Sequence, residues 1–208
     1  MKGRSTSPFL PRRSGGRKPI IFQGVTAQVR NSRMNHYCLP NILIMEDFEK
    51  EKLSLKRVLE DAFKNIVFPG DDKLLAPDSF DDNDIVDFKQ DTFWKTDWRL
   101  IPEEVIDLNH QSLPFFSPEA YRFYLPAYLR RAIDTLFVAD INVLEFTLYN
   151  LVPDKTSSRI LKRFERRKQA LDDRQKQVVI RFLEFVKKWC DDDTLSRVAD
   201  EGLKEYWR

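Results

Sequence analysis

The chain has 208 residues, 42% of them hydrophobic, with 16 phenylalanines, six tyrosines, four tryptophans and only six glycines. This composition supports one packed core and disfavours an all-β fold, so we expect an all-α protein. The formal net charge of +2 conceals an asymmetry, because residues 1–45 carry basic side chains and no Asp or Glu. The rest is therefore mildly acidic, which argues against a general nucleic-acid surface there.

The first 45 residues form a predicted basic leader, and residues 46–208 a predicted all-helical domain. Residues 1–33 mix Lys and Arg with Ser, Gly and Pro without periodicity, a composition typical of disorder. Three interpretations stay open: a tail that binds nucleic acid or an anionic surface, a leader without a partner, or a start codon assigned too early. Met34 and Met45 are alternatives to Met1 as the first residue.

The first amphipathic pattern predicts a helix from about Asp47 to Val67, ended by Pro69 and Gly70. The aspartates of residues 78–87 that follow lack the turn glycine and final glutamate of a calcium loop. We expect them to be solvated and to cap a short helix, and we predict no metal site.

Two tryptophans, Trp94 and Trp98, precede a short helix predicted to begin at Pro102 and to end near Asn109. Aromatic side chains close to loops can anchor a protein partner, so both are candidate partner-binding residues. The alternative is that they cover the core.

The central element is a helix predicted to begin at Pro118, because Ser117 offers a capping hydroxyl and proline suits the first helical position. Between Ala120 and Leu129 it carries no charged side chain except Arg122. A helix that is apolar on nearly every side belongs in the middle of a bundle. Pro126 interrupts its hydrogen-bond ladder, so we predict a single-domain irregular helical bundle around a central proline-kinked helix.

The predicted kink could open a small polar pocket. Glu119, Arg122, Tyr124 and Tyr128 are the candidate catalytic residues of such a pocket, in a hydrolase that uses carboxylate, tyrosine and arginine side chains. The alternative is that the tyrosines pack in the core with their hydroxyls at its edge. Other carboxylates could converge there, namely Glu103, Glu104 and Asp134.

The phrase PFFSPEAYRFYLPAYL, around Phe115–Tyr128, resembles the signature of an uncharacterised bacterial domain family of unknown function. Three further segments fit the resemblance: AFKNIVFPGDD, LDDRQKQVVIRFLEF and the ending LKEYW. Together they cover roughly residues 53–208. The resemblance implies no activity, cofactor or catalytic residue.

After the central helix we predict a helix INVLEFTLYNL capped by Asp140, and then a basic amphipathic segment, residues 159–168. Arg163, Arg166 and Arg167 of that segment are candidate partner-binding residues, unless the basic face is simply solvated. Two more helices follow, the first opened by a capping box of Asp172 and Gln175. The last ends in Tyr206 and Trp207, which indicates a terminus that is tied down.

The chain lacks the motifs of phosphate, dinucleotide, zinc and serine-nucleophile sites, and we predict no cofactor. Cys38 and Cys190 show no pairing pattern, which is typical of reduced thiols in the cytoplasm. No apolar run reaches the length of a membrane span.

Three functional hypotheses remain. The first is a cytoplasmic domain that binds another macromolecule, most plausibly a protein, without catalysis. The second is the small hydrolase with its pocket at Pro126. The third is nucleic-acid binding, in which only the basic leader and the 159–168 segment are expected to contact the nucleic acid. The oligomeric state is not predicted.

Overall fold

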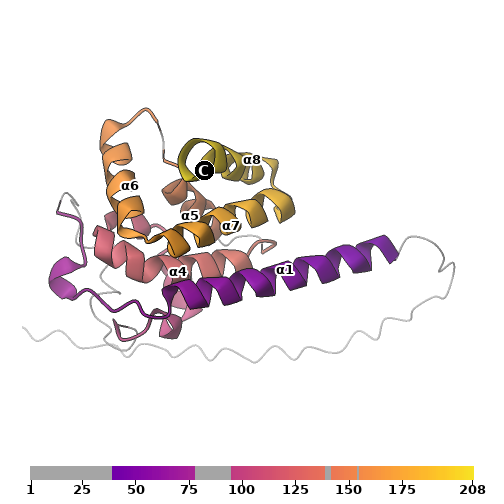
Figure 1. Cartoon of the computed structure of the whole chain (residues 1–208), viewed down its shortest axis with the longest axis horizontal. Helices are drawn as coiled ribbons and strands as arrows, with labels where there is room; N and C mark the ends of the chain where they lie inside the picture. The colour runs from indigo at the N-terminus through magenta and orange to yellow at the C-terminus, as the bar shows by residue number, and fades with distance from the viewer. Residues whose placement is uncertain (1–38, 78–94, 139–141, 154) are drawn as a thin grey trace, which may run out of the picture. The chain divides into compact units, whose positions relative to one another are not determined.

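The computed structural model of the chain describes residues 39–77, 95–138, 142–153 and 155–208 (Figure 1). The leader through residue 38, the acidic segment 78–87, Trp94 and the predicted cap Asp140 lie outside these ranges. Side chains are described from residue 43 onward.

The regular structure in these ranges is helical, which confirms the all-α prediction. The long helices are α1 (Leu39–Phe63), α4 (Pro118–Asp134), α5 (Val143–Leu151), α6 (Ser158–Ala170), α7 (Asp173–Trp189) and α8 (Asp193–Gly202). The short ones are α3 (Glu103–Leu108), the 3₁₀ turns η1 (Asp71–Lys73), η4 (Trp98–Leu100) and η5 (Leu113–Phe115), and the π-helical turn η6 (Leu203–Trp207). An isolated antiparallel bridge joins Leu75 to Phe116.

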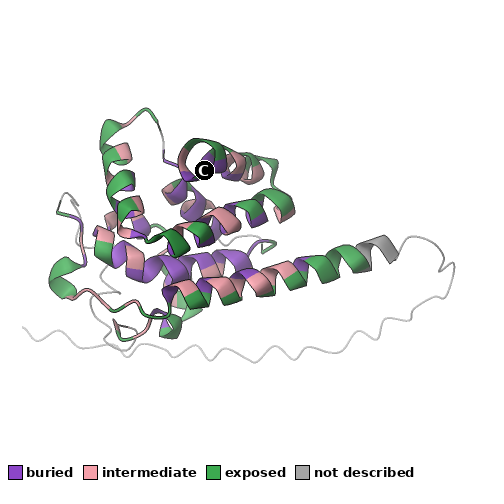
Figure 2. Ribbon diagram, in the orientation of Figure 1, coloured by how far each residue is buried: buried purple, intermediate pink, exposed green. Residues whose placement is uncertain are grey.

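Helix α4 is the centre of the bundle. It begins at Pro118 as predicted, and the Ser117 hydroxyl accepts a hydrogen bond from the amide of Ala120 at 3.0 Å. The helix continues through Pro126, which is buried, and it packs against α1, α3, α5 and α6. Most of α4 is coloured as buried in Figure 2, because its apolar side chains point in every direction around the axis.

Helix α1 differs from its predicted bounds at both ends. It begins at Leu39 instead of near Asp47, and it ends at Phe63 instead of Val67. The earlier start is consistent with Pro40, because proline is tolerated in the first helical turn. The helix therefore crosses the predicted boundary between residues 45 and 46, and its N-terminal turns extend past the neighbouring helices (Figure 1).

A buried amide joins three helices at the start of α7. Gln175 is 1% exposed, and its Nε2 donates to the carbonyl of Ala62 at 3.3 Å. Its Oε1 accepts from Arg122 Nε at 2.9 Å and from the amide of Asp172 at 3.1 Å. The Asp172 carboxylate accepts from the amide of Gln175, so the predicted capping box is confirmed.

The C-terminal turn is tied to α5 and α6. Trp207 is 6% exposed, its Nε1 donates to the carbonyl of Leu151 at 2.8 Å, and its ring meets that of Phe164 edge to face. This arrangement confirms the predicted docking of the terminus.

We predict that Trp207→Ala lowers the free energy of unfolding by about 3–5 kcal/mol, since it removes a large buried ring and leaves the carbonyl of Leu151 without its indole donor. Urea titration followed by circular dichroism measures this loss. Trp207→Phe, which keeps a buried ring, is the matched control and should lose less. A loss below about 1 kcal/mol for Trp207→Ala would contradict the packing described.

Candidate functional site

The two tyrosines of the predicted kink pocket are core residues. Tyr124 and Tyr128 are fully buried. The Tyr128 hydroxyl donates to the carbonyl of Asn109 at 2.6 Å, and the ring of Phe116 stacks on Tyr124 at 4.6 Å between centroids. Burial raises the pKa of both phenols well above the usual value, so both stay protonated at neutral pH.

Glu119 and Arg122 lie apart from these tyrosines, at a surface hollow of about 630 Å³ that is also lined by residues 65–69, Lys73 and Ala170. The Arg122 guanidinium is held by Gln175 and, at 3.1 Å, by the Asp172 carboxylate. The structure therefore places the four candidate catalytic residues in two different environments. Among the described residues that line this hollow there is no His, Cys, Ser, Thr or Asp.

The other candidate carboxylates are also separated. Glu119 lies in the first turn of α4 and Asp134 in the last, about 22 Å apart along a helix that rises 1.5 Å per residue. Glu103 pairs with Arg131, which also donates to Asp107 at 2.6 Å and so fastens α3 to α4. These carboxylates do not form a common site.

Asp134 ties α4 to α1. Its carboxylate accepts hydrogen bonds from Lys56 Nζ at 2.7 Å, and Lys52 Nζ lies 3.1 Å away. Burial raises the pKa of Asp134, but the hydrogen bonds from Lys56 and Lys52 outweigh burial and hold this pKa below its usual value. The arrangement is an interhelical clamp.

Trp98, a candidate for partner binding, is 1% exposed. Its Nε1 donates to the carbonyl of Phe63 at 3.1 Å, and the Arg130 guanidinium covers its ring at 5.5 Å. The indole therefore closes the core beneath the end of α1 and presents no surface to a partner in this conformation. Trp94 lies outside the described residues.

The three candidate arginines of α6 share a shallow depression with Phe116 and Pro118. Arg167 is 6% exposed and donates to the carbonyl of Leu113 and to Asn150 Oδ1, with its guanidinium 5.0 Å from the Tyr121 ring. Arg163 and Arg166 also make interactions of their own. The depression encloses about 10 Å³, room for roughly one water molecule. Arg167 is thus a buried structural residue.

The sequence analysis did not identify an exposed apolar surface at the opposite end of α4. We define the end surface as Ile44, Met45, Phe137 and Val138, whose exposed fractions are 52%, 52%, 52% and 49%. Phe48 joins its two halves: its ring lies 5.1 Å from that of Phe137 and 5.4 Å from that of Trp189. Ile44 and Met45 lie one helical turn before Phe48, so they extend the same face of α1 beyond the bundle.

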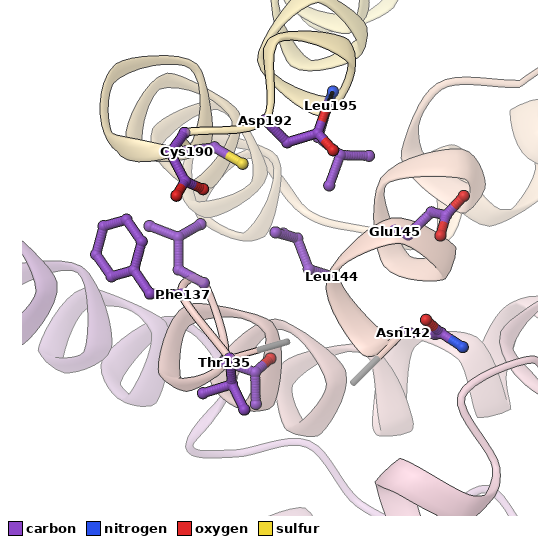
Figure 3. Close-up of a pocket in the computed structure, with 11 residues that line it drawn as sticks. Thr135, Phe137, Asn142, Leu144, Glu145, Cys190, Asp192 and Leu195 are labelled. Carbon is purple, nitrogen blue, oxygen red and sulfur yellow. Dashed lines mark hydrogen bonds between the residues drawn. The ribbon is translucent and has the colours of Figure 1, made fainter. Parts of the chain in front are cut away.

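A hollow of about 340 Å³ adjoins the end surface, and Phe137 and Val138 line both (Figure 3). We call it the acidic hollow because its described lining includes three carboxylates and no Lys or Arg. The three carboxylates are Glu145, Asp191 and Asp192. Besides these and Phe137 and Val138, the lining residues are Thr135, Leu136, Asn142, Leu144, Cys190 and Leu195. They come from the segment just after α4, the start of α5, the turn between α7 and α8, and the first turn of α8.

Two titratable groups report the electrostatics of this region. Burial raises the pKa of the Cys190 thiol, and the charges of Asp191 and Asp192 raise it further. Burial and the Glu145 carboxylate likewise raise the pKa of Tyr149 on α5, with a contribution from Asp192. Cys190 is therefore a protonated thiol at neutral pH, without the thiolate character of a nucleophile.

Among the described residues, no three His, Cys, Asp or Glu side chains are grouped so that they could hold a metal ion. None of the helices in the described ranges combines the length and apolar character that a membrane span requires.

A family model for a family of unknown function (DUF6714) matches residues 51–208. The match confirms the expected resemblance to a family of unknown function. No curated protein and no solved structure matches the chain.

We predict that Asp134→Asn lowers the free energy of unfolding by about 1–2 kcal/mol at pH 7, because two partly buried lysines lose their anion. A carboxylate with a lowered pKa stabilises the fold above its unfolded pKa of about 4, and this contribution disappears as the pH falls through the folded pKa. Wild type and variant should therefore converge in urea titrations at the acid end of a pH series.

The control for this prediction is Glu184→Gln, which removes an exposed pair with Arg208 and should change the stability little. An Asp134→Asn deficit that persists unchanged into acid would contradict the clamp.

Proposed function

We propose that this chain, which belongs to the DUF6714 family of unknown function, is a protein-interaction domain without catalysis of its own, acting in the bacterial cytoplasm. The partner binds at the end surface of Ile44, Met45, Phe137 and Val138. The proposed location rests on the family resemblance and on a cysteine pattern typical of reduced thiols.

The observation that carries the proposal is that four half-exposed large apolar side chains lie at one end of the bundle. Single exposed apolar residues are ordinary, and Val67 and Leu108, at 80% and 78% exposed, are examples elsewhere on this chain. A group of exposed apolar side chains around the buried ring of Phe48 is different, because water contact with them is unfavourable and a partner that covers them gains the hydrophobic free energy.

The N-terminal turns of α1 add to this support. Residues 43–47 are all exposed, so no helix of the described ranges packs over them (Figure 2). Short helical segments are marginal in water without tertiary packing. A partner at the end surface would supply that packing.

The two other hypotheses have less support from the geometry. A hydrolase at the kink would need Glu119 and Arg122 to act with Tyr124 and Tyr128, whose rings lie in the core. Nucleic-acid binding through α6 would use Arg167, whose guanidinium is committed to Leu113 and Asn150.

We predict that the double variant Ile44→Ser/Met45→Ser loses a protein partner that wild type retains. The experiment is a tagged, nuclease-treated pull-down from cells that express the chain natively, with quantitative mass spectrometry. Both side chains are exposed, so the variant should fold like wild type, which circular dichroism checks.

The matched control is Val67→Ser/Leu108→Ser, which removes two apolar side chains elsewhere that are more exposed than Ile44 and Met45. A partner held equally well by wild type, the control and the end-surface variant would contradict the proposed site. Capture of no protein by wild type would contradict the binding function itself.

A further inference from the structure

We propose that the segment docking on the end surface is a basic peptide segment with bulky apolar side chains, whose Lys or Arg groups lie against the carboxylates of the acidic hollow. This inference rests on the proposed function and specifies the chemistry of the partner.

Carboxylates border the apolar residues of the end surface. The hollow that begins at Phe137 and Val138 is lined by Glu145, Asp191 and Asp192 and, in its described lining, by no cation. Asp191 and Asp192 are both exposed, and Asp192 also accepts hydrogen bonds from the amides of Thr194 and Leu195 as the cap of α8. An apolar surface bordered by carboxylates is complementary to a partner that is both apolar and basic.

The α1 half of the surface carries the same sign. Glu46, Asp47 and Glu49 are exposed beside the apolar pair, and Glu49 lies one helical turn after Met45. Lys50 is exposed there too, so carboxylates outnumber cations three to one over residues 46–50. Lys52, on the following turn, is already paired with Asp134. Negative charge thus lies on both sides of the apolar residues.

The raised pKa values of Cys190 and Tyr149 agree with this distribution, because neighbouring carboxylates contribute to both. Together with the described geometry they indicate a negative potential from α5 to the turn before α8.

The lining and the volume of the hollow suit lysine or arginine side chains. Leu136, Leu144 and Leu195 supply apolar wall, and the carboxylates lie on the same lining (Figure 3). Lys and Arg pack their aliphatic stems on apolar surface while the charged head stays in a polar setting. A volume of about 340 Å³ is enough for such stems.

Other occupants fit less well. A nucleic acid or an anionic membrane would bring its phosphates against Glu145, Asp191 and Asp192. A symmetric contact with a second copy would place the same carboxylates near one another across the two-fold axis. The basic segment is the occupant that this charge pattern favours.

The test uses three fluorescein-labelled amphipathic peptides with the same leucine positions and with Lys, Gln or Glu at every polar position. Their binding to the full chain is measured by fluorescence anisotropy at about 150 mM salt. The Lys peptide should bind at least about tenfold more tightly than the Gln peptide, and the Glu peptide should bind most weakly.

The variant Glu145→Gln/Asp191→Asn should weaken binding of the Lys peptide by about tenfold, and Ile44→Ser/Met45→Ser should weaken binding of both the Lys and Gln peptides. The matched control is Glu165→Gln, which removes an exposed carboxylate on α6 and should leave all affinities unchanged.

Equal affinity for the Lys and Gln peptides, no binding of any peptide, or an unchanged affinity of the Glu145→Gln/Asp191→Asn variant would overturn the inferred partner chemistry. Protein capture that depends on Ile44 and Met45 but survives Glu145→Gln/Asp191→Asn would overturn this inference and leave the proposed function standing. Concentration-dependent dimers in sedimentation that are abolished by Ile44→Ser/Met45→Ser would identify a second copy as the occupant and would also overturn it.

Discussion

Helix α4 has almost no solvent-exposed face, because from Ala120 to Leu129 every side chain except Arg122 is buried. A helix with this pattern is stable only when other elements surround it, since its apolar area must leave water on all sides. The contacts of α4 with α1, α3, α5 and α6 satisfy this requirement. The polar groups at its borders, such as Arg122 with Gln175 and Asp134 with the α1 lysines, fix how the neighbouring helices dock.

The end surface exists because helix α1 extends beyond the end of helix α4 and the neighbouring helices. Helix α1 begins at Leu39, more than a turn before it reaches the ring of Phe48, where it meets Phe137 and Trp189. At residues 43–47 the α1 side chains are exposed and no helix of the described ranges covers them, while α4 ends at Asp134 and leaves Phe137 and Val138 half exposed. The carboxylates of α5 and of the turn before α8 border this opening. An incomplete end of the bundle is thereby both apolar and acidic.

Local signals in the sequence predicted the local features of the fold. The Ser117 cap, the Asp172–Gln175 capping box and the docked Trp207 were all predicted, because each rests on neighbouring residues or on a strong helical period. The start of α1 was predicted wrongly, since residues 39–45 carry no polar face that would reveal a helical period.

The candidate site depends on contacts that sequence spacing cannot supply. Trp98 and Arg167 were candidates for a partner surface, but their hydrogen-bond acceptors belong to the distant residues Phe63 and Leu113. The half exposure of Phe137 depends on how Phe48 of α1 packs beside it, a contact between residues far apart in the sequence. The apolar run before residue 46 was the available signal for the end surface, and only the tertiary arrangement brings it near Val138.

Whether a partner protein covers the end surface can be measured by site-specific photo-crosslinking in cells that express the chain natively. Benzoylphenylalanine would replace Ile44 or Val138 in separate experiments, and Leu108 in the control, and each adduct would be identified by mass spectrometry. We expect positions 44 and 138 to capture the same protein through a basic segment and position 108 to capture none. Adducts at all three positions alike, or none at 44 and 138, would contradict this expectation.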